Sequence, residues 1–242
     1  MIFLFTDFGL EGPYIGQMKA ALHRVAPQAP VFDLFADAPD RRPQESAYLL
    51  AAYAESCPQG SHFLCVVDPG VGGDRPPVAL HAQGRWFVGP GNGLFELVQR
   101  RTPHAESYRI DWRPERLSSS FHGRDLFAPV MGRLAAGASA QEAGLTPHAT
   151  PRFPDWPDDL PAVIYQDRYG NLMTGLRYAT LTRKSCLRID NTDIPWAETF
   201  SAAPKGRAFW YGNSTGLVEI AVNGGSAALT LMAGIASRVE II

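Results

Sequence analysis

The chain has 242 residues, of which 45% are hydrophobic and 19% are charged, and its formal net charge is −2. This length can form one large domain or two small ones with a buried core, and the composition excludes an intrinsically disordered chain. Because there is no basic excess, neither a nucleic acid nor a membrane surface is an expected partner.

The first 150 residues alternate between strand and helix signals. Buried apolar runs predict strands, and one close pair of runs predicts a hairpin: 1–6, 31–35, 62–67, 78–82 and 85–89. Helical spacing of apolar residues, bounded by prolines and glycines, predicts four helices: 14–26, 43–56, 93–101 and 126–137. We therefore expect an α/β domain with a largely parallel sheet over residues 1–150.

The composition changes near residue 150. Residues 146–161 hold five prolines and no helical period, which predicts a linker at 151–161. Beyond it, short strand-like runs are separated by Gly, Asn and Asp: 162–167, 185–190, 208–212, 217–222, 228–232 and 238–242. This pattern predicts a small β-barrel or sandwich over residues 162–242.

Two predicted strands end in an aspartate. Asp7 follows the first strand in "TDFG", and Asp68 follows the third in "DPGVGGDR", with Arg75 seven residues later. Ligands of open α/β sheets bind outside the carboxyl ends of the strands, so both carboxylates are candidate site residues. Turn chemistry is the competing interpretation, because Asp-Pro-Gly favours turns.

The glycine-rich segment 87–96, "FVGPGNGLFE", precedes a predicted helix. It could hold a phosphate, but it lacks the Lys and Ser/Thr of a P-loop and the spacing of a dinucleotide fingerprint. We interpret it as a tight turn with Asn92 as a helix cap.

The segment 118–129, "SSSFHGRDLFAP", places His122, Arg124 and Asp125 between two phenylalanines. Asp125 could cap the helix that follows, with Arg124 in solvent. This explanation leaves His122 without a role, so His122 is a candidate for chemistry.

The C-terminal part contains "DRYGN" at 167–171 and "YGNSTGLVEIAVNGG" at 211–225. Turn chemistry explains their glycines and asparagines. Asp167, Tyr169 and Asn171 could also form a polar pocket with an aromatic wall, which suits a base or an ammonium group.

Taken together, these segments resemble the S-adenosyl-L-methionine (SAM) hydroxide adenosyltransferase family, the SAM hydrolases, which is related to the enzymatic fluorinase and chlorinase. The matching segments follow one another in order along nearly the whole chain: "TDFG" with "YIGQMK", "VVDPGVGG" with Arg75, "FVGPGNGLF", "FHGRDLFAP", "DRYGNLMT" and "NSTGLVEIA". The resemblance implies an α/β domain, a C-terminal β-barrel, and hydrolysis of SAM to adenosine and L-methionine with no further cofactor and no metal. It also implies a homotrimer whose active sites lie between the N-terminal domain of one subunit and the C-terminal domain of its neighbour.

The resemblance also assigns roles to residues. The family's catalytic set matches Asp68, Arg75 and His122. Asp7 matches the family's ribose contact, and Asp167 matches the contact to the methionine ammonium. Tyr169 and Asn171 match contacts to the adenine, and Ser214 matches a contact to the methionine carboxylate. The backbone around Asn223 and Gly224 is expected to face the adenine edge.

Three positions depart from the family pattern and affect the expected substrate contacts. Gly91 stands where Asp is usual, Gly175 stands where Asn is usual, and Thr215 stands where the fluorinase has arginine. The three catalytic positions are intact. His122 also distinguishes this chain from the halogenating relatives, which lack that imidazole.

The expected reaction is displacement at the ribose C5′ carbon, where the sulfonium leaves as a neutral thioether and needs no general acid. Water has a pKa of about 15.7 and aspartic acid about 3.9, so forming free hydroxide beforehand would cost roughly 16 kcal/mol. We therefore expect the proton to leave during or after attack. Arg75 stays protonated and is expected to orient Asp68 or the water, whereas Asp68 and His122 both remain candidate proton acceptors.

Three alternatives remain open on the sequence. The first is a SAM-dependent halogenase of the chlorinase type. The second is a metal-dependent hydrolase built from Asp7, Asp68, His122 and Asp125, although paired-histidine spacing is absent. The third is a protein that binds adenosine or SAM without catalysis.

The cysteine and hydropathy patterns indicate a cytoplasmic protein. Cys57, Cys65 and Cys186 are far apart and odd in number, which argues against a disulfide framework or a zinc site. The longest apolar run, 47–54, is too short to span a bilayer. The apolar run 1–5 is too short for the core of a signal peptide.

Overall fold

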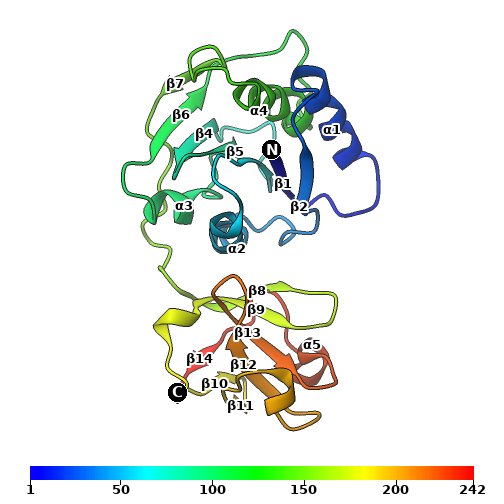
Figure 1. Ribbon diagram of the computed structural model, residues 1–242, viewed down its shortest axis with the longest axis vertical. Helices are drawn as coiled ribbons and strands as arrows, with labels where there is room; N and C mark the ends of the chain where they lie inside the picture. Colours follow the sequence, from blue (N-terminus) through cyan, green and yellow to red (C-terminus); the bar gives the residue numbers. More distant parts are fainter. The chain divides into compact units, whose positions relative to one another are not determined.

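The computed structural model describes residues 1–242, which form two compact units (Figure 1). The first unit comprises Met1–Leu50 and Cys57–Phe153, and the second comprises Ala51–Ser56 and Pro154–Ile242. None of the helices combines the length and the apolar character needed to cross a membrane.

The first unit is built on a seven-stranded mixed sheet with the order β2-β1-β3-β5-β4-β6-β7. Its strands are β1 (Ile2–Thr6), β2 (Val31–Phe35), β3 (His62–Val66), β4 (Pro77–Ala82), β5 (Arg85–Pro90), β6 (Glu106–Ile110) and β7 (Leu145–Pro147). Strands β2, β1, β3 and β5 pair in parallel, and β4, β6 and β7 continue the sheet with antiparallel pairings. Only β4 and β7 therefore run against the other strands, and the predicted α/β class is confirmed.

The first unit contains three α-helices, α1 (Tyr14–Val25), α3 (Glu96–Arg100) and α4 (Ala128–Ala135), and the start of a fourth. This fourth helix is α2 (Pro43–Ser56), whose residues Ala51–Ser56 belong to the second unit. Helices α1 and α4 lie side by side (Figure 1), and both contribute to the core over β1 and β3. Gly132 permits this approach, because a Cβ atom there would lie 2.9 Å from the Cβ of Val25.

The structure corrects several predicted boundaries in the first unit. The helix expected over 93–101 is confined to Glu96–Arg100, and strands β6 and β7 were not predicted. The helix expected from residue 126 begins earlier, as a π-helical turn at Gly123–Phe127 that continues into α4. The turn and α4 have no side-chain cap, so the interpretation of Asp125 as a helix cap is wrong.

The second unit is all antiparallel in its strand pairings. One sheet has the order β12-β13-β9-β8 and the other β11-β10-β14. The strands are β8 (Leu160–Gln166), β9 (Leu172–Arg177), β10 (Leu187–Ile189), β11 (Thr192–Ile194), β12 (Ala208–Gly212), β13 (Leu217–Val222) and β14 (Glu240–Ile241). The two sheets enclose a core around Trp210 and Ile220. The pairings confirm the β architecture but do not close it into a barrel.

One predicted strand of the second unit is a helix. Residues 228–232 form a short, mostly apolar run that predicts a strand, yet Ala227–Leu231 form helix α5. The Ser226 hydroxyl accepts a hydrogen bond from the Leu229 N–H at 3.2 Å, which caps the helix at its start. Met232 ends it in the left-handed conformation, with φ 49°.

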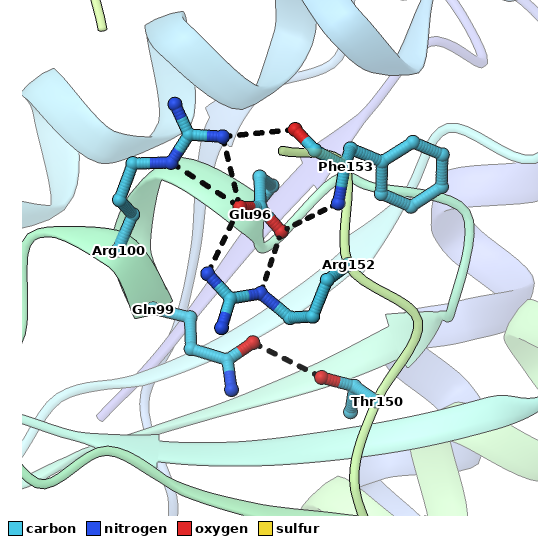
Figure 2. Close-up of polar contacts among 6 residues, drawn as sticks. All are labelled: Glu96, Gln99, Arg100, Thr150, Arg152 and Phe153. Carbon is cyan, nitrogen blue, oxygen red and sulfur yellow. Dashed lines mark hydrogen bonds and ion pairs between the residues drawn. The ribbon is translucent and has the colours of Figure 1, made fainter. Parts of the chain in front are cut away.

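A buried carboxylate fixes the last residues of the first unit (Figure 2). The side chain of Glu96 is fully buried and accepts hydrogen bonds from Arg100 at 3.0 Å, from Arg152 at 3.0 Å and from the Phe153 N–H at 3.1 Å. Burial alone would raise the pKa of Glu96, but these hydrogen bonds, led by that of Arg152, outweigh it and lower the pKa. The segment before Pro154 is therefore held against α3 by paired charge.

Candidate active site

The two strand-end aspartates line the same cavity. Strands β1 and β3 pair in parallel with Thr6 opposite Val66, so the segments that follow leave the same edge of the sheet. Asp7 and Asp68 both face a cavity of about 380 Å³ that His122 also lines. The structure thus brings these three predicted site residues together.

Asp68 and Arg75 form a buried ion pair beside this cavity. Arg75 Nε donates to Asp68 Oδ1 at 2.9 Å, and Arg75 Nη2 donates to Asp68 Oδ2. The side chains are 4% and 10% exposed, respectively. Bidentate geometry of this kind fixes a carboxylate in both position and orientation. Asp68 keeps further lone pairs and can still accept a proton.

The turn that carries this pair needs a glycine. Gly72 has φ +79°, and a Cβ atom there would lie 2.5 Å from the carbonyl oxygen of Ser119. The loop between Asp68 and Arg75 can therefore lie directly against the segment that leads to His122.

His122 is held in one protonation state by the same arginine. Arg75 Nη2 lies 3.0 Å from His122 Nδ1. A guanidinium group only donates hydrogen bonds, so Nδ1 accepts and the imidazole proton is on Nε2. Burial and then the charge of Arg75 lower the pKa of His122 below its ordinary value of 6.5. The imidazole is therefore neutral, and its free nitrogen is a hydrogen-bond donor.

Aromatic rings form one wall of the cavity. Phe121 contacts Phe8 and Tyr14 edge-on, with ring centroids 5.8 and 5.5 Å apart. The guanidinium group of Arg124 lies over the ring of Phe121, with its central carbon 5.0 Å from the ring centroid. Phe121 thus belongs to a packed aromatic cluster at the cavity, whereas Phe127, the second phenylalanine of the motif, is fully buried in the core of the first unit.

Asp7 also lines this cavity and is partly desolvated. Burial raises the pKa of Asp7 above its ordinary value, although a hydrogen bond from the Arg41 N–H at 2.9 Å opposes this effect. One oxygen of the carboxylate is thereby oriented by the backbone. The other oxygen can accept hydrogen bonds from a ligand in the cavity.

Asp125 and Arg124 act on the loop rather than on the cavity. Asp125 accepts hydrogen bonds from the Ser118 N–H at 3.0 Å and from Arg124 at 2.6 Å. The hydrogen bond from Arg124 lowers the pKa of Asp125. Asp125 thus fixes the start of the segment that carries His122.

Asn92 also differs from its predicted role. Its Nδ2 donates to the carbonyl of Val67 at 2.9 Å, and its Oδ1 accepts from the Leu94 N–H at 3.4 Å. Helix α3 begins only at Glu96, so Asn92 does not cap it. Instead, Asn92 holds the backbone next to Asp68.

The second unit has its own cavity, of about 790 Å³. Five predicted binding residues line it: Asp167, Tyr169, Asn171, Ser214 and Gly224. Asn223 does not, because its side chain donates to the Ala203 carbonyl at 2.7 Å and its backbone bonds to Gly206 and Arg207.

Asp167 is the centre of a tight turn. It accepts hydrogen bonds from the Tyr169 N–H at 2.9 Å, the Asn171 N–H at 2.8 Å and Asn171 Nδ2 at 2.8 Å. Gly170 has φ +82° in this turn. The carboxylate is thus fixed by neutral donors and faces the cavity with no cationic side chain attached.

Several residues of this cavity were missed by the sequence reasoning, chiefly Tyr53, Tyr211, Asn213 and Glu219. Glu219 lies on β13, is 4% exposed, and accepts hydrogen bonds from the Tyr211 hydroxyl and from Asn213 Nδ2 at 3.0 Å. A signal was present, because Glu219 is the single ionisable residue in the fully buried strand Leu217–Val222. Tyr53 lies within a helix and carried no such signal.

The four residues considered for a metal centre are not arranged as one. No group of three or more His, Cys, Asp and Glu side chains in residues 1–242 could hold a metal ion. Arg75 binds both Asp68 and His122 Nδ1, so a guanidinium occupies the position that a shared cation would take.

The first unit is an α/β domain with an Asp–Arg–His cluster near its strand ends, and an antiparallel β unit follows it. This combination defines a class of two-domain proteins, and the sequence matches a known family over both units. The SAM hydroxide adenosyltransferase N-terminal domain matches residues 2–144, and the C-terminal domain of the same family matches residues 161–240. The chain belongs to the SAM hydroxide adenosyltransferase family.

Curated relatives and solved structures agree with this assignment. The chain is 36% identical to the (R)-S-adenosyl-L-methionine hydrolase of Thermus thermophilus, over 98% of both chains. It is 38% identical to the enzyme of the same name from Salinispora arenicola, over 92% of this chain and 90% of that one. The crystal structure of a conserved protein from Thermotoga maritima superposes with a TM-score of 0.90 at 27% identity, covering 100% of this chain and 99% of that one.

Proposed function

We propose that the protein is an (R)-SAM hydrolase, which cleaves SAM to adenosine and L-methionine by attack of water on the ribose C5′ carbon. The observation that carries the proposal is the Asp68–Arg75–His122 cluster, which faces the same cavity as Asp7. The relatives that bear this activity in their names are matched over nearly their full lengths.

In the proposed mechanism, His122 positions the water and Asp68 receives its proton. The Nδ1 lone pair of His122 is engaged by Arg75, so Nε2–H donates to the water oxygen and the imidazole takes no proton. Asp68 keeps a free lone pair despite its two hydrogen bonds from Arg75. Of the two acceptors left open by the sequence, the geometry favours Asp68.

The proton moves late in this mechanism. Forming hydroxide on Asp68 before attack would span about 12 pKa units, roughly 16 kcal/mol. Once the oxygen has bonded to C5′, the attached proton is strongly acidic, and transfer to a carboxylate is downhill. Alignment of the water with the C5′–S bond then supplies most of the rate enhancement, for which about 7–11 kcal/mol is attainable.

The remaining residues bind the substrate. Asp7, whose Oδ2 is oriented by the Arg41 N–H, accepts hydrogen bonds from the ribose hydroxyls. In the second unit, Asp167 binds the methionine ammonium, Ser214 its carboxylate, and Tyr169 with Asn171 the adenine. Gly224 presents backbone to the adenine edge. Asn223 has no part in this assignment, because its own polar groups are engaged within the unit.

We further propose a homotrimer in which each active site combines the first-unit cavity of one subunit with the second-unit cavity of its neighbour. Each cavity leaves an aromatic side chain in solvent, since Tyr14 is 50% and Tyr169 is 78% exposed. Mixing two inactive variants, Asp68→Asn and Asp167→Asn, tests this arrangement. Sites shared between subunits regain activity after mixing and subunit exchange, whereas sites within one chain do not.

The protein is assigned to the cytoplasm in this proposal, because its three cysteines are free thiols. No nucleic acid, membrane or metal partner is invoked, and SAM and adenosine are its small-molecule ligands.

The decisive experiment is incubation of the pure protein with SAM in metal-free, halide-free buffer made with oxygen-18 water. Adenosine carrying oxygen-18, together with methionine, supports water attack at C5′. A 5′-chloro-adenosine product after chloride addition would support the halogenase instead. Intact SAM with adenosine still bound would indicate a binding protein.

A further inference from the structure

Glu219 is a buried carboxylate whose charge is not matched by any cation of the protein. It lies in the middle of β13, is 4% exposed, and lines the second-unit cavity. Its two oxygens accept hydrogen bonds from the Tyr211 hydroxyl and from the Asn213 amide, which are both neutral. No ion pair joins Glu219 to a lysine, arginine or histidine.

The carboxylate of Glu219 contributes to a raised pKa at two neighbouring tyrosines. Burial and then the hydrogen bond to Glu219 raise the pKa of Tyr211, which keeps that hydroxyl a donor. Burial and then the charge of Glu219 likewise raise the pKa of Tyr53. A carboxylate held in this way is costly unless a positive group compensates it.

The rest of the cavity also lacks positive charge. Its lining includes a second carboxylate, Asp167, but no lysine, arginine or histidine. Four aromatic residues complete the walls: Tyr53, Tyr169, Phe200 and Tyr211. The faces of aromatic rings attract cations, and this attraction is strongest in a desolvated site. The cavity is therefore suited to a ligand with two positive centres.

We propose that Glu219 recognises the sulfonium of the substrate, while Asp167 binds its ammonium; this inference rests on the proposed function. The methionine arm of SAM carries these two positive centres and one carboxylate. In S-adenosylhomocysteine, the sulfonium is replaced by a neutral thioether. Glu219 is thus the residue that makes the site prefer a charged sulfur over a neutral one.

This assignment has a consequence for turnover. Breaking the C5′–S bond converts the sulfonium into the neutral thioether of methionine, and the bonding electrons remain on sulfur. The methionine arm loses the charge that Glu219 attracts as soon as the bond breaks. Product methionine is therefore held less tightly than the same arm in the substrate.

Competitive inhibition by three ligands tests the role of Glu219. Sinefungin places a protonated amine where SAM has the sulfonium, S-adenosylhomocysteine has a neutral sulfur, and adenosine lacks the arm. The unmutated enzyme should bind sinefungin more tightly than S-adenosylhomocysteine. Glu219→Gln should reduce that preference by about tenfold while leaving adenosine affinity unchanged.

Tyr211→Phe is the matched control, because it removes the hydroxyl donor but keeps the charge of Glu219. This variant should retain the preference for sinefungin. An unchanged preference in Glu219→Gln, or equal weakening of all three ligands, would overturn the assignment and leave Glu219 a structural residue. The unmutated enzyme provides a second check, which does not depend on a variant that folds. If it binds sinefungin no more tightly than S-adenosylhomocysteine, the assignment of Glu219 is also overturned. Hydrolysis of SAM by that enzyme is measured separately, so the proposed function can stand while this inference fails.

Discussion

Asp68 in the first cavity and the two carboxylates of the second cavity are compensated in opposite ways. In the first unit, the carboxylate of Asp68 is neutralised within the protein by Arg75, which also engages His122. In the second unit, Asp167 and Glu219 are held by neutral donors alone. A self-compensated site can hold a neutral nucleophile such as water, whereas an uncompensated site attracts a cation. The difference separates the chemistry of the proposed reaction from recognition of its substrate.

The largest effect is expected where the compensated pair is broken. Asp68→Asn removes the proposed proton acceptor and leaves Arg75 without its charge partner, so kcat should fall by about 10³-fold. Single-turnover assays with SAM measure this loss. Asp74→Asn changes an exposed acid of the same loop and should keep nearly full activity. Near-normal kcat in Asp68→Asn would remove the distinction between the two cavities.

A smaller effect is expected at His122, with a diagnostic pH dependence. His122→Ala removes the group that positions the water and should lower kcat by about 10²-fold, with little change in SAM affinity. The pKa of His122 is lowered, so the imidazole is neutral at pH 7 and becomes protonated only as the pH falls below 6.5. Protonation would place a hydrogen on Nδ1, against Arg75.

The kcat of the unmutated enzyme should therefore be flat from about pH 8 down to about pH 6.5 and decline below that range. The free energy of unfolding should also decrease as the pH falls below about 6.5. His122 has a lower pKa in the folded protein than in the unfolded chain, so the unfolded chain binds the proton more readily and is favoured at low pH. Profiles of kcat and of urea unfolding across this range check both statements. A decline in kcat that begins well above pH 6.5 would contradict a neutral His122.

The smallest effect on activity is expected at Glu96, which belongs to neither cavity. Glu96→Gln weakens five hydrogen bonds from three residues in a fully buried site and should lower the free energy of unfolding by about 1–3 kcal/mol. At 25 °C, kcat/KM should be unchanged. Glu240→Gln, at an exposed and loosely paired carboxylate, serves as the control for thermal unfolding. Lost activity in a folded Glu96→Gln protein would show that the hydrogen bonds of Glu96 act on the site.

The catalytic half of the site was easier to predict than the binding half, for physical reasons. Asp7 and Asp68 follow apolar strands, and parallel pairing necessarily brings such strand ends to one edge. The protonation state of His122 could not be predicted, because it depends on a contact with Arg75 across 47 residues. In the second unit, antiparallel pairing of β12 with β13 places Tyr211 opposite Glu219, and no local pattern specifies that register.

Local patterns also failed where two structures compete for one sequence. The mostly apolar run 228–232 is compatible with a strand, but the cap provided by Ser226 favours a single helical turn. Five residues are too few for periodicity to decide between them. The helix expected over 93–101 is shorter than its apolar residues indicate, because the glycine-rich turn before it continues up to Phe95.

The two glycines that depart from the family pattern restrict which residues can occupy their positions. A Cβ atom at Gly91 would lie 2.9 Å from the Pro76 carbonyl oxygen, and one at Gly175 would lie 2.9 Å from that of Leu160. Neither position can accept a larger residue unless the facing residue moves as well. A substitution at either glycine is therefore expected to be tolerated only together with a second change at the residue that faces it.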